Sequence, residues 1–134
     1  MTALPCILCV DDEPQILQGL TLNLRRHYRV LTAASGADAL KVLAAEPAAE
    51  VVLSDMTMPG MDGPALLKQI AQLYPHITRI LLTGETSHEA ATKAVSAGQV
   101  FKFLTKPCAP QELRAAVDAG VKHHRQNCIA KAAQ

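Results

Sequence analysis

Five polar residues follow short apolar segments of this 134-residue chain, and their side chains are of types that act together in chemistry. Asp11 and Asp12 follow the first segment, Asp55 the third, Thr83 the fourth and Lys106 the fifth. Functional residues of a parallel α/β sheet gather at the carboxyl ends of its strands. If the segments are strands of such a sheet, three carboxylates, one hydroxyl and one ammonium meet at one rim.

Three carboxylates at one rim repel one another, so a compensating cation is expected. Mg²⁺ binds through a few carboxylates while keeping several waters, and it can also neutralise a phosphoryl group during transfer. The Asp55 carboxylate is a nucleophile of the kind that forms an aspartyl phosphate. The Lys106 ammonium and the Thr83 hydroxyl suit the phosphoryl oxygens. The set predicts Mg²⁺-dependent phosphoryl transfer to Asp55.

Each of these residues also has an ordinary structural explanation when it is taken alone. Asp12 could cap a helix that begins at Pro14. Thr83 could be a strand-end residue and Lys106 a solvated loop charge. Residues 58–63, MPGMDG, contain two turn-forming dipeptides and could be a plain turn. The chemical interpretation depends on all five residues occurring together.

The elements that must position these side chains alternate along the chain. Nearly continuous apolar runs predict five strands covered on both faces, at residues 6–10, 30–33, 51–53, 80–82 and 100–104. The stretches between and after them predict five helices, so the fold class is α/β with helices on both faces of a sheet.

Apolar spacing and capping residues mark these helices. Pro14 suits the first turn of the first helix, and Ser35 is a candidate N-cap of the second. Residues 87–97 are rich in Ala and predict a weakly anchored fourth helix, and the tail from about Lys122 either prolongs the fifth helix or frays. The apolar faces of the others are formed by Leu17, Leu20 and Leu24; Leu40 and Leu43; Leu66, Ile70 and Leu73; and Leu113, Val117, Gly120 and Val121.

Composition narrows the class of protein. With 49% hydrophobic and 19% charged residues, the chain is typical of a soluble globular domain, and its length fits a single domain. A net charge of +1 lacks the basic excess of a nucleic-acid binder, so no direct nucleic-acid binding is expected. No basic segment opens the chain and no apolar run approaches about 20 residues, which predicts a cytoplasmic protein without a signal peptide or membrane contact.

Cys6 and Cys9 have the CxxC spacing of redox and zinc sites. Residues three apart in a strand point to opposite faces, and no further ligands lie at suitable spacing. We therefore interpret both as small core residues of the first strand.

Four motifs resemble the receiver domain of bacterial two-component response regulators: ILCVDDEP, VVLSDMTMPGMDG, ILLTGE and FKFLTKP. They occur in the family's order and spacing, and the resemblance covers residues 5–125. It implies the flavodoxin-like receiver fold, a doubly wound five-stranded parallel sheet of strand order 2-1-3-4-5. It also implies that Asp11, Asp12 and Asp55 hold the Mg²⁺ with the backbone carbonyl of Met56.

The resemblance assigns further roles around Asp55. Thr83 is the switch hydroxyl and Phe103 the switch aromatic, while a cis bond between Lys106 and Pro107 places the lysine. Thr57 and Glu85 modulate the lifetime of the phosphoryl group.

The implied function is a phosphorylation-dependent switch and not an enzyme with its own substrate. None of the five histidines suits phosphotransfer, so a partner histidine kinase, a phosphotransfer protein or a small phosphodonor must supply the group. The surface of the fourth helix, fifth strand and fifth helix then controls an output domain or partner, and homodimerisation is possible. We expect a receiver domain at residues 1–126 and a tail or linker at 127–134.

Two alternatives stay open at this point. A pseudo-receiver would act as an interaction module without phosphorylation, although such a protein is expected to lack one of the five polar residues. A phosphohydrolase would carry a second acid two residues after its nucleophile, where this chain has Thr57.

Overall fold

The computed structural model describes residues 4–46, 48–84, 88–96, 100–106 and 108–132, without the side chains of residue 88 and residues 128–132. Five strands alternate with five helices along the chain. The elements are β1 Cys6–Val10, α1 Pro14–Leu24, β2 Arg29–Ala33, α2 Gly36–Ala45, β3 Ala49–Asp55, α3 Gly63–Leu73, β4 Thr78–Thr83, α4 His88–Ser96, β5 Lys102–Thr105 and α5 Pro110–Ala132.

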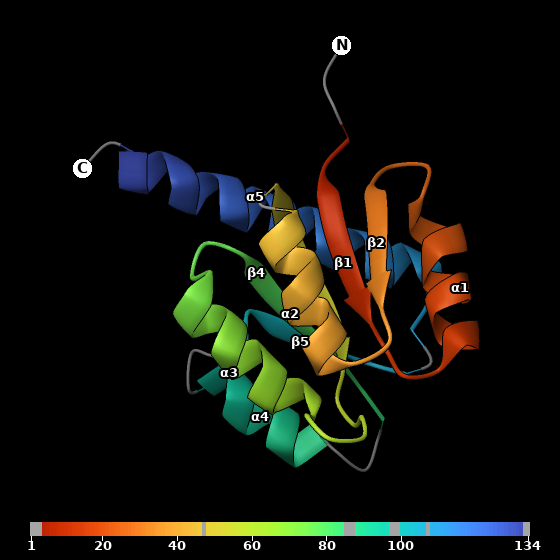
Figure 1. Cartoon of the computed structure of the whole chain (residues 1–134). Helices are drawn as coiled ribbons and strands as arrows, with labels where there is room; N and C mark the ends of the chain where they lie inside the picture. The colour runs from red at the N-terminus through yellow and green to blue at the C-terminus, as the bar shows by residue number, and fades with distance from the viewer. Residues whose placement is uncertain (1–3, 47, 85–87, 97–99, 107, 133–134) are drawn as a thin grey trace.

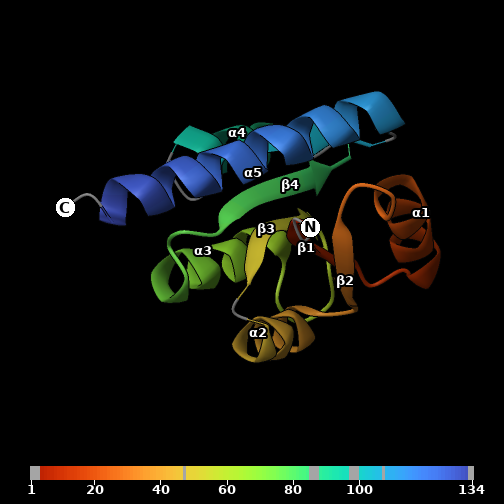
Figure 2. The same cartoon turned by 90° about the horizontal axis from the view of Figure 1, so that it is seen from above.

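The strands form one parallel sheet in the order β2-β1-β3-β4-β5, which confirms the predicted fold. In Figure 1, α2 and α3 lie in front of the strands while α5 runs behind them. Helix α5 packs along β3 and β4, and its C-terminal part extends past the sheet (Figure 2). Because all strands run the same way, the residues that follow β1, β3, β4 and β5 lie at one rim.

Two hydrophobic cores form on the two faces of the sheet. One cluster includes residues of α2, α3 and α4, and the other includes residues of α1 and α5. Cys6 belongs to the first cluster and Cys9 to the second, both nearly fully buried. The two thiols therefore point to opposite faces, which confirms the interpretation of CxxC as core residues of a strand.

Helix starts follow local sequence. The Ser35 hydroxyl accepts a hydrogen bond from the Asp38 amide at 3.1 Å, which confirms Ser35 as the N-cap of α2. Asp62 caps α3 in the same way through the Ala65 amide at 2.9 Å, a cap that we did not predict.

One predicted helix face was wrong, and several strand boundaries differ from the prediction: β2, β3 and β4 are longer than the apolar runs that predicted them, and β5 is shifted. Leu73 is 61% exposed, because the next position on the buried face after Ile70 is Tyr74, four residues on. Strand β5 begins at Lys102 and not at Val100, because its pairing with β4 starts there, although Val100 is buried in the core.

The remaining helices agree with expectation where they are described. Helix α4 covers residues 88–96 of the predicted 87–97, and the two outer positions lie outside the described residues. Helix α5 continues without a break to residue 132, so the stretch after Lys122 prolongs the helix as one of the two predicted outcomes. Within the described ranges, no helix combines the length and apolarity needed to cross a membrane.

Candidate functional site

The rim at the carboxyl ends of the strands brings three carboxylates together. Asp11 follows β1, Asp55 is the last residue of β3, and Asp12 lies next to Asp11 at the start of the loop to α1. One carboxylate oxygen from each lies within 4.8 Å of the others. This cluster is the one that the sequence predicted, although the roles of its members remain predictions.

Lys106 completes the charge pattern of this rim. Its Nζ lies 2.6 Å from Asp55 Oδ1 and 3.3 Å from Asp11 Oδ2. Burial lowers the pKa of Lys106, but the hydrogen bonds and negative charges of Asp55 and Asp11 outweigh burial and raise the pKa overall. The ammonium is therefore charged at neutral pH and offsets part of the carboxylate repulsion.

Asp11 and Asp12 differ sharply in their surroundings. Asp11 is fully buried and its Oδ1 accepts a hydrogen bond from the Glu13 amide at 2.9 Å, whereas Asp12 is exposed. Burial raises the pKa of Asp11, and the Glu13 amide and the Lys106 charge only partly oppose this effect. Asp11 is thus a carboxylate held in a site that disfavours its charge, which is the situation in which a bound cation is most useful.

Backbone hydrogen bonds between neighbouring strands fix the positions of these side chains. The Lys106 amide donates to the Thr83 carbonyl at 2.8 Å, and the Met56 amide donates to the Leu82 carbonyl at 2.9 Å. The Asp11 amide donates to the Ala33 carbonyl at 3.1 Å. The sheet ladder therefore continues into the rim, so the polar side chains stand on rigid backbone.

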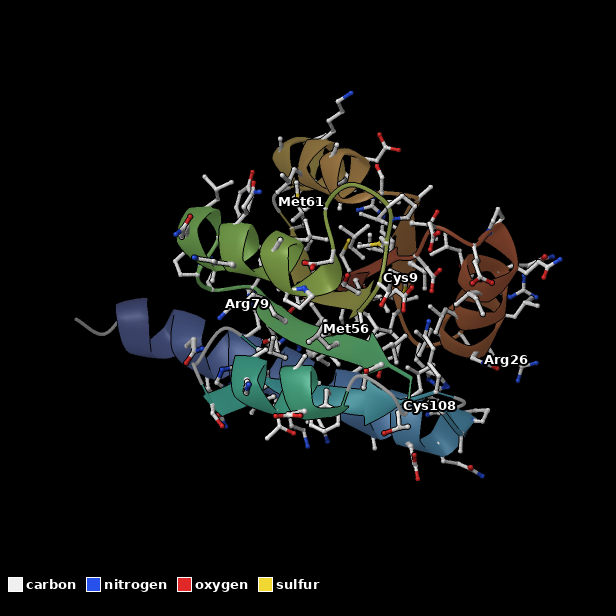
Figure 3. All side chains as sticks on the ribbon, turned by 90° about the horizontal axis from the view of Figure 1, so that it is seen from below. Cys9, Arg26, Met56, Met61, Arg79 and Cys108 are labelled. Atoms are coloured by element: carbon white, nitrogen blue, oxygen red, sulfur yellow. The ribbon has the colours of Figure 1, made fainter. Side chains whose placement is uncertain are left out.

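The loop from β3 to α3 folds back on the end of β3. The Met56 carbonyl accepts a hydrogen bond from the Gly63 amide at 2.9 Å, which leaves the second lone pair of its oxygen. Gly60 has φ +81°, a conformation that favours glycine. Figure 3 shows Met56 beside the end of β4 and Met61 beside α2, where Met61 packs against Gly36.

The other predicted residues lie around this rim or outside the described residues. Thr83 is fully buried, and its hydroxyl donates to the Gly84 carbonyl at 3.0 Å. Phe103 is partly buried against the core that includes α4, and Thr57 is exposed. Glu85 and the bond from Lys106 to Pro107 involve residues outside the description.

Two residues that support Asp55, Ser54 and Gly63, were not predicted from the sequence. Ser54 is fully buried and its hydroxyl donates to the Asp55 carbonyl at 3.0 Å. Gly63 lies so close that a Cβ there would be 2.3 Å from the Asp55 carbonyl oxygen. The available signals were the serine between the apolar run 51–53 and Asp55, and the glycine that ends MPGMDG.

Comparison with known proteins agrees with this geometry. The family model described as "Response regulator receiver domain" matches residues 7–118. Among curated proteins, the transcriptional regulatory protein GlrR of Escherichia coli K12 is 42% identical over 113 residues, covering 84% of this chain and 25% of the relative. The DNA-binding transcriptional regulator NtrC of the same strain is 40% identical over 118 residues, covering 87% and 25%.

Solved structures give the same result. One described as adenylate cyclase from Rhodopirellula baltica has a TM-score of 0.92 and 34% identity, covering 96% of this chain and 95% of the other. A response regulator receiver domain protein from Clostridium thermocellum has a TM-score of 0.86 and 33% identity, covering 94% and 99%. The chain spans about a quarter of the length of the curated relatives. The chain therefore belongs to the response regulator receiver domain family, whose members are the phosphorylation-dependent signalling switches of two-component systems.

Proposed function

We propose that Asp55 accepts a phosphoryl group from a partner histidine kinase or phosphotransfer protein in a Mg²⁺-dependent reaction. The observation that supports this proposal is the convergence of three carboxylates and one lysine at the rim. Asp55 lies at the end of the central strand β3, in contact with the lysine and within 4.8 Å of the other two acids. This is the placement expected of a nucleophile that needs both a cation and an ammonium beside it.

The donor set fits a magnesium ion. Mg²⁺ prefers oxygen ligands at about 2.1 Å in octahedral geometry, which places neighbouring ligand oxygens about 3 Å apart and opposite ones about 4.2 Å apart. Oxygens of Asp11, Asp12 and Asp55 that lie within 4.8 Å of one another need only small side-chain adjustments to reach those positions. The Met56 carbonyl oxygen would be a fourth ligand, bound through the lone pair that does not accept the Gly63 amide. When bound, the ion would neutralise charge on the transferred phosphoryl group.

The chain's own residues would then perform the transfer. An Asp55 carboxylate oxygen attacks the phosphorus, while the bond from phosphorus to the donor breaks and its electron pair stays with the donor. Lys106 shifts its contact from the Asp55 carboxylate to a phosphoryl oxygen, which keeps the ammonium paired throughout. Receivers of this kind also lose the phosphoryl group by hydrolysis, so we propose that the reaction resets a switch and does not turn over a separate substrate.

Thr83 and Phe103 would transmit the change. The Thr83 hydroxyl now satisfies a neighbouring carbonyl, and phosphorylation offers it a strong acceptor in exchange. Movement of Thr83 opens space for Phe103 to turn inward beside α4. Among its described side chains, helix α4 fully buries only the small ones of Ala91 and Ala94 and packs Val95 partly against the core, so shifting it disturbs little packing.

We propose that the α4-β5-α5 surface controls an output domain or a partner protein, with a homodimer as a further use of the same surface. The relatives GlrR and NtrC are transcriptional regulators of which this chain matches about a quarter, which supports an output function of that general kind. The assignment of residues 1–126 to the receiver domain and 127–134 to a tail or linker belongs to the same proposal.

Intact mass measurement with a small phosphodonor tests the central claim. Wild type with Mg²⁺ is expected to gain one phosphoryl group, and Asp55→Asn or wild type in EDTA is expected to gain none. Asp62→Asn is a matched control, because this exposed carboxylate lies on the same loop but only caps α3. A phosphorylated species that persists in Asp55→Asn would refute the assignment, and a wild type that binds no Mg²⁺ would favour the pseudo-receiver alternative.

Thr57 and Glu85 are proposed to set the phosphoryl lifetime. Thr57 is exposed in the loop that follows Asp55, where its side chain can limit the approach of water. The decay rate of the phosphorylated protein is expected to change in Thr57 and Glu85 variants. Decay rates equal to that of wild type would remove this role.

A further inference from the structure

The peptide group between Asp55 and Met56 is held at both ends. Its N–H, on Met56, donates to the Leu82 carbonyl at 2.9 Å. Its carbonyl, on Asp55, accepts the hydroxyl of Ser54 at 3.0 Å. Ser54 is fully buried, so no water competes for this hydrogen bond. The peptide plane that follows the acceptor residue is therefore fixed on both sides.

The next carbonyl along the chain is held as well. The Met56 carbonyl accepts the Gly63 amide at 2.9 Å, and Gly63 lies directly against the Asp55 carbonyl. A side chain at Gly63 would place its Cβ 2.3 Å from that oxygen, so the first turn of α3 can approach the end of β3 only because residue 63 is glycine. Two consecutive carbonyls thus have fixed directions before any ligand arrives.

We infer that Ser54 is a positioning residue for the phosphoacceptor site. Rotation of the peptide between Asp55 and Met56 would tilt the Asp55 side chain and move the Met56 carbonyl at the same time. The Ser54 hydroxyl opposes this rotation from inside the core. It therefore holds two groups of the proposed metal site in one geometry, and the inference rests on the proposed function.

A merely structural role for Ser54 is the competing explanation. A buried hydroxyl that satisfies a buried carbonyl stabilises a fold wherever it occurs. The chain offers a matched control at the opposite end of the sheet, where the Thr78 hydroxyl donates to the Gly120 carbonyl at 2.7 Å and is also buried. Thr78→Val removes that hydrogen bond while keeping a branched side chain of similar size.

The test compares Ser54→Ala with Thr78→Val in two measurements. The first is Mg²⁺ affinity by titration calorimetry, where Ser54→Ala is expected to bind about tenfold more weakly, as for other groups that orient metal ligands. The second is amide hydrogen exchange of the metal-free protein, where the Met56 and Gly63 amides are expected to exchange faster. Thr78→Val is expected to match wild type in both.

Further variants keep the outcome decisive. Ser54→Thr restores the hydroxyl and is expected to return both measurements toward wild type. If Ser54→Ala does not fold, Ser54→Cys keeps the volume with a weaker donor and is expected to show an intermediate affinity.

A folded Ser54→Ala with wild-type affinity and exchange would overturn the inference, as would an equal loss of affinity in Thr78→Val. If wild type itself bound no Mg²⁺, the proposed function would fail. The exchange measurement on metal-free protein would still decide whether Ser54 holds the peptide.

Discussion

Replacing Asp11 by asparagine is expected to stabilise the metal-free protein. The asparagine would keep the size of the side chain and an oxygen that accepts the Glu13 amide, now 2.9 Å from Asp11 Oδ1. The substitution removes one of three clustered negative charges, of which Asp11 and Asp55 pair with Lys106. It also removes a charge from a fully buried position.

The distances give the magnitude. With an effective dielectric constant of about 20, a carboxylate pair separated by no more than 4.8 Å repels by at least about 3.5 kcal/mol, so the two neighbours of Asp11 together repel it by at least about 7 kcal/mol. The Lys106 ammonium, 3.3 Å from Asp11 Oδ2, attracts Asp11 by about 5 kcal/mol and offsets most of this repulsion. Asp12 is exposed, so solvent screening weakens its repulsion of Asp11. We therefore expect Asp11→Asn to raise the free energy of unfolding by about 1–2 kcal/mol.

Thermal unfolding in EDTA measures this gain as a rise in Tm of about 3–8 °C. Added Mg²⁺ is expected to raise the Tm of wild type but not that of Asp11→Asn, because the variant lacks a proposed ligand. Burial raises the pKa of Asp11, so the protonated carboxyl stabilises the fold at low pH and this stabilisation is lost as pH rises through the raised pKa. The advantage of the variant should therefore shrink as pH is lowered.

A variant that is less stable than wild type in EDTA at neutral pH would refute the electrostatic argument. An advantage that is independent of pH would show that the gain comes from packing and not from the charge.

Three further predictions concern a close backbone contact, a helix cap and a buried thiol. Gly63→Ala is expected to destabilise the protein by about 1–3 kcal/mol in urea unfolding, because the new Cβ would overlap the Asp55 backbone. Gly19→Ala in α1 is the control: its Cβ would meet nothing within 4 Å, so this change should stabilise the protein by about 0.5–1 kcal/mol. Equal effects of the two substitutions would contradict the close contact at Gly63. Asp62→Ala should cost about 1 kcal/mol through loss of the α3 cap, and unchanged stability would remove that role. Burial raises the pKa of Cys9 to about 12, so peptide mapping after thiol labelling of the folded protein should find Cys108 modified well before Cys9, and equal rates would be inconsistent with a buried thiol.

Much of the fold followed from short-range patterns. Apolar runs placed all five strands, and the N-cap at Ser35 was found because its side chain acts on a backbone amide three residues away. Strand ends were harder, because the start of β5 depends on where β4 pairs with it and not on the letters around Val100. The prediction that Leu73 faces the core was wrong for a similar reason. At the end of α3 the three-dimensional packing places Tyr74, and not Leu73, against the core.

The site divides along the same line. Asp11, Asp12, Asp55 and Lys106 were predictable because strand ends in a parallel sheet must meet at one rim. Ser54 was not, because a buried serine in a strand has many possible acceptors and only the three-dimensional fold shows that it serves the Asp55 carbonyl.

Helix α5 has a consequence for anything joined to its end. The Thr78 hydroxyl lies 2.7 Å from the Gly120 carbonyl and His124 Nδ1 lies 2.7 Å from the His76 carbonyl, so the helix is fastened both to the start of β4 and to the turn that precedes it. An α-helix turns by about 100° and rises about 1.5 Å per residue. If another segment is joined to this helix, the number of helical residues between the sheet and that segment sets the direction in which the segment points. Adding one residue would turn the attached segment by more than a quarter of a full rotation with almost no change in distance.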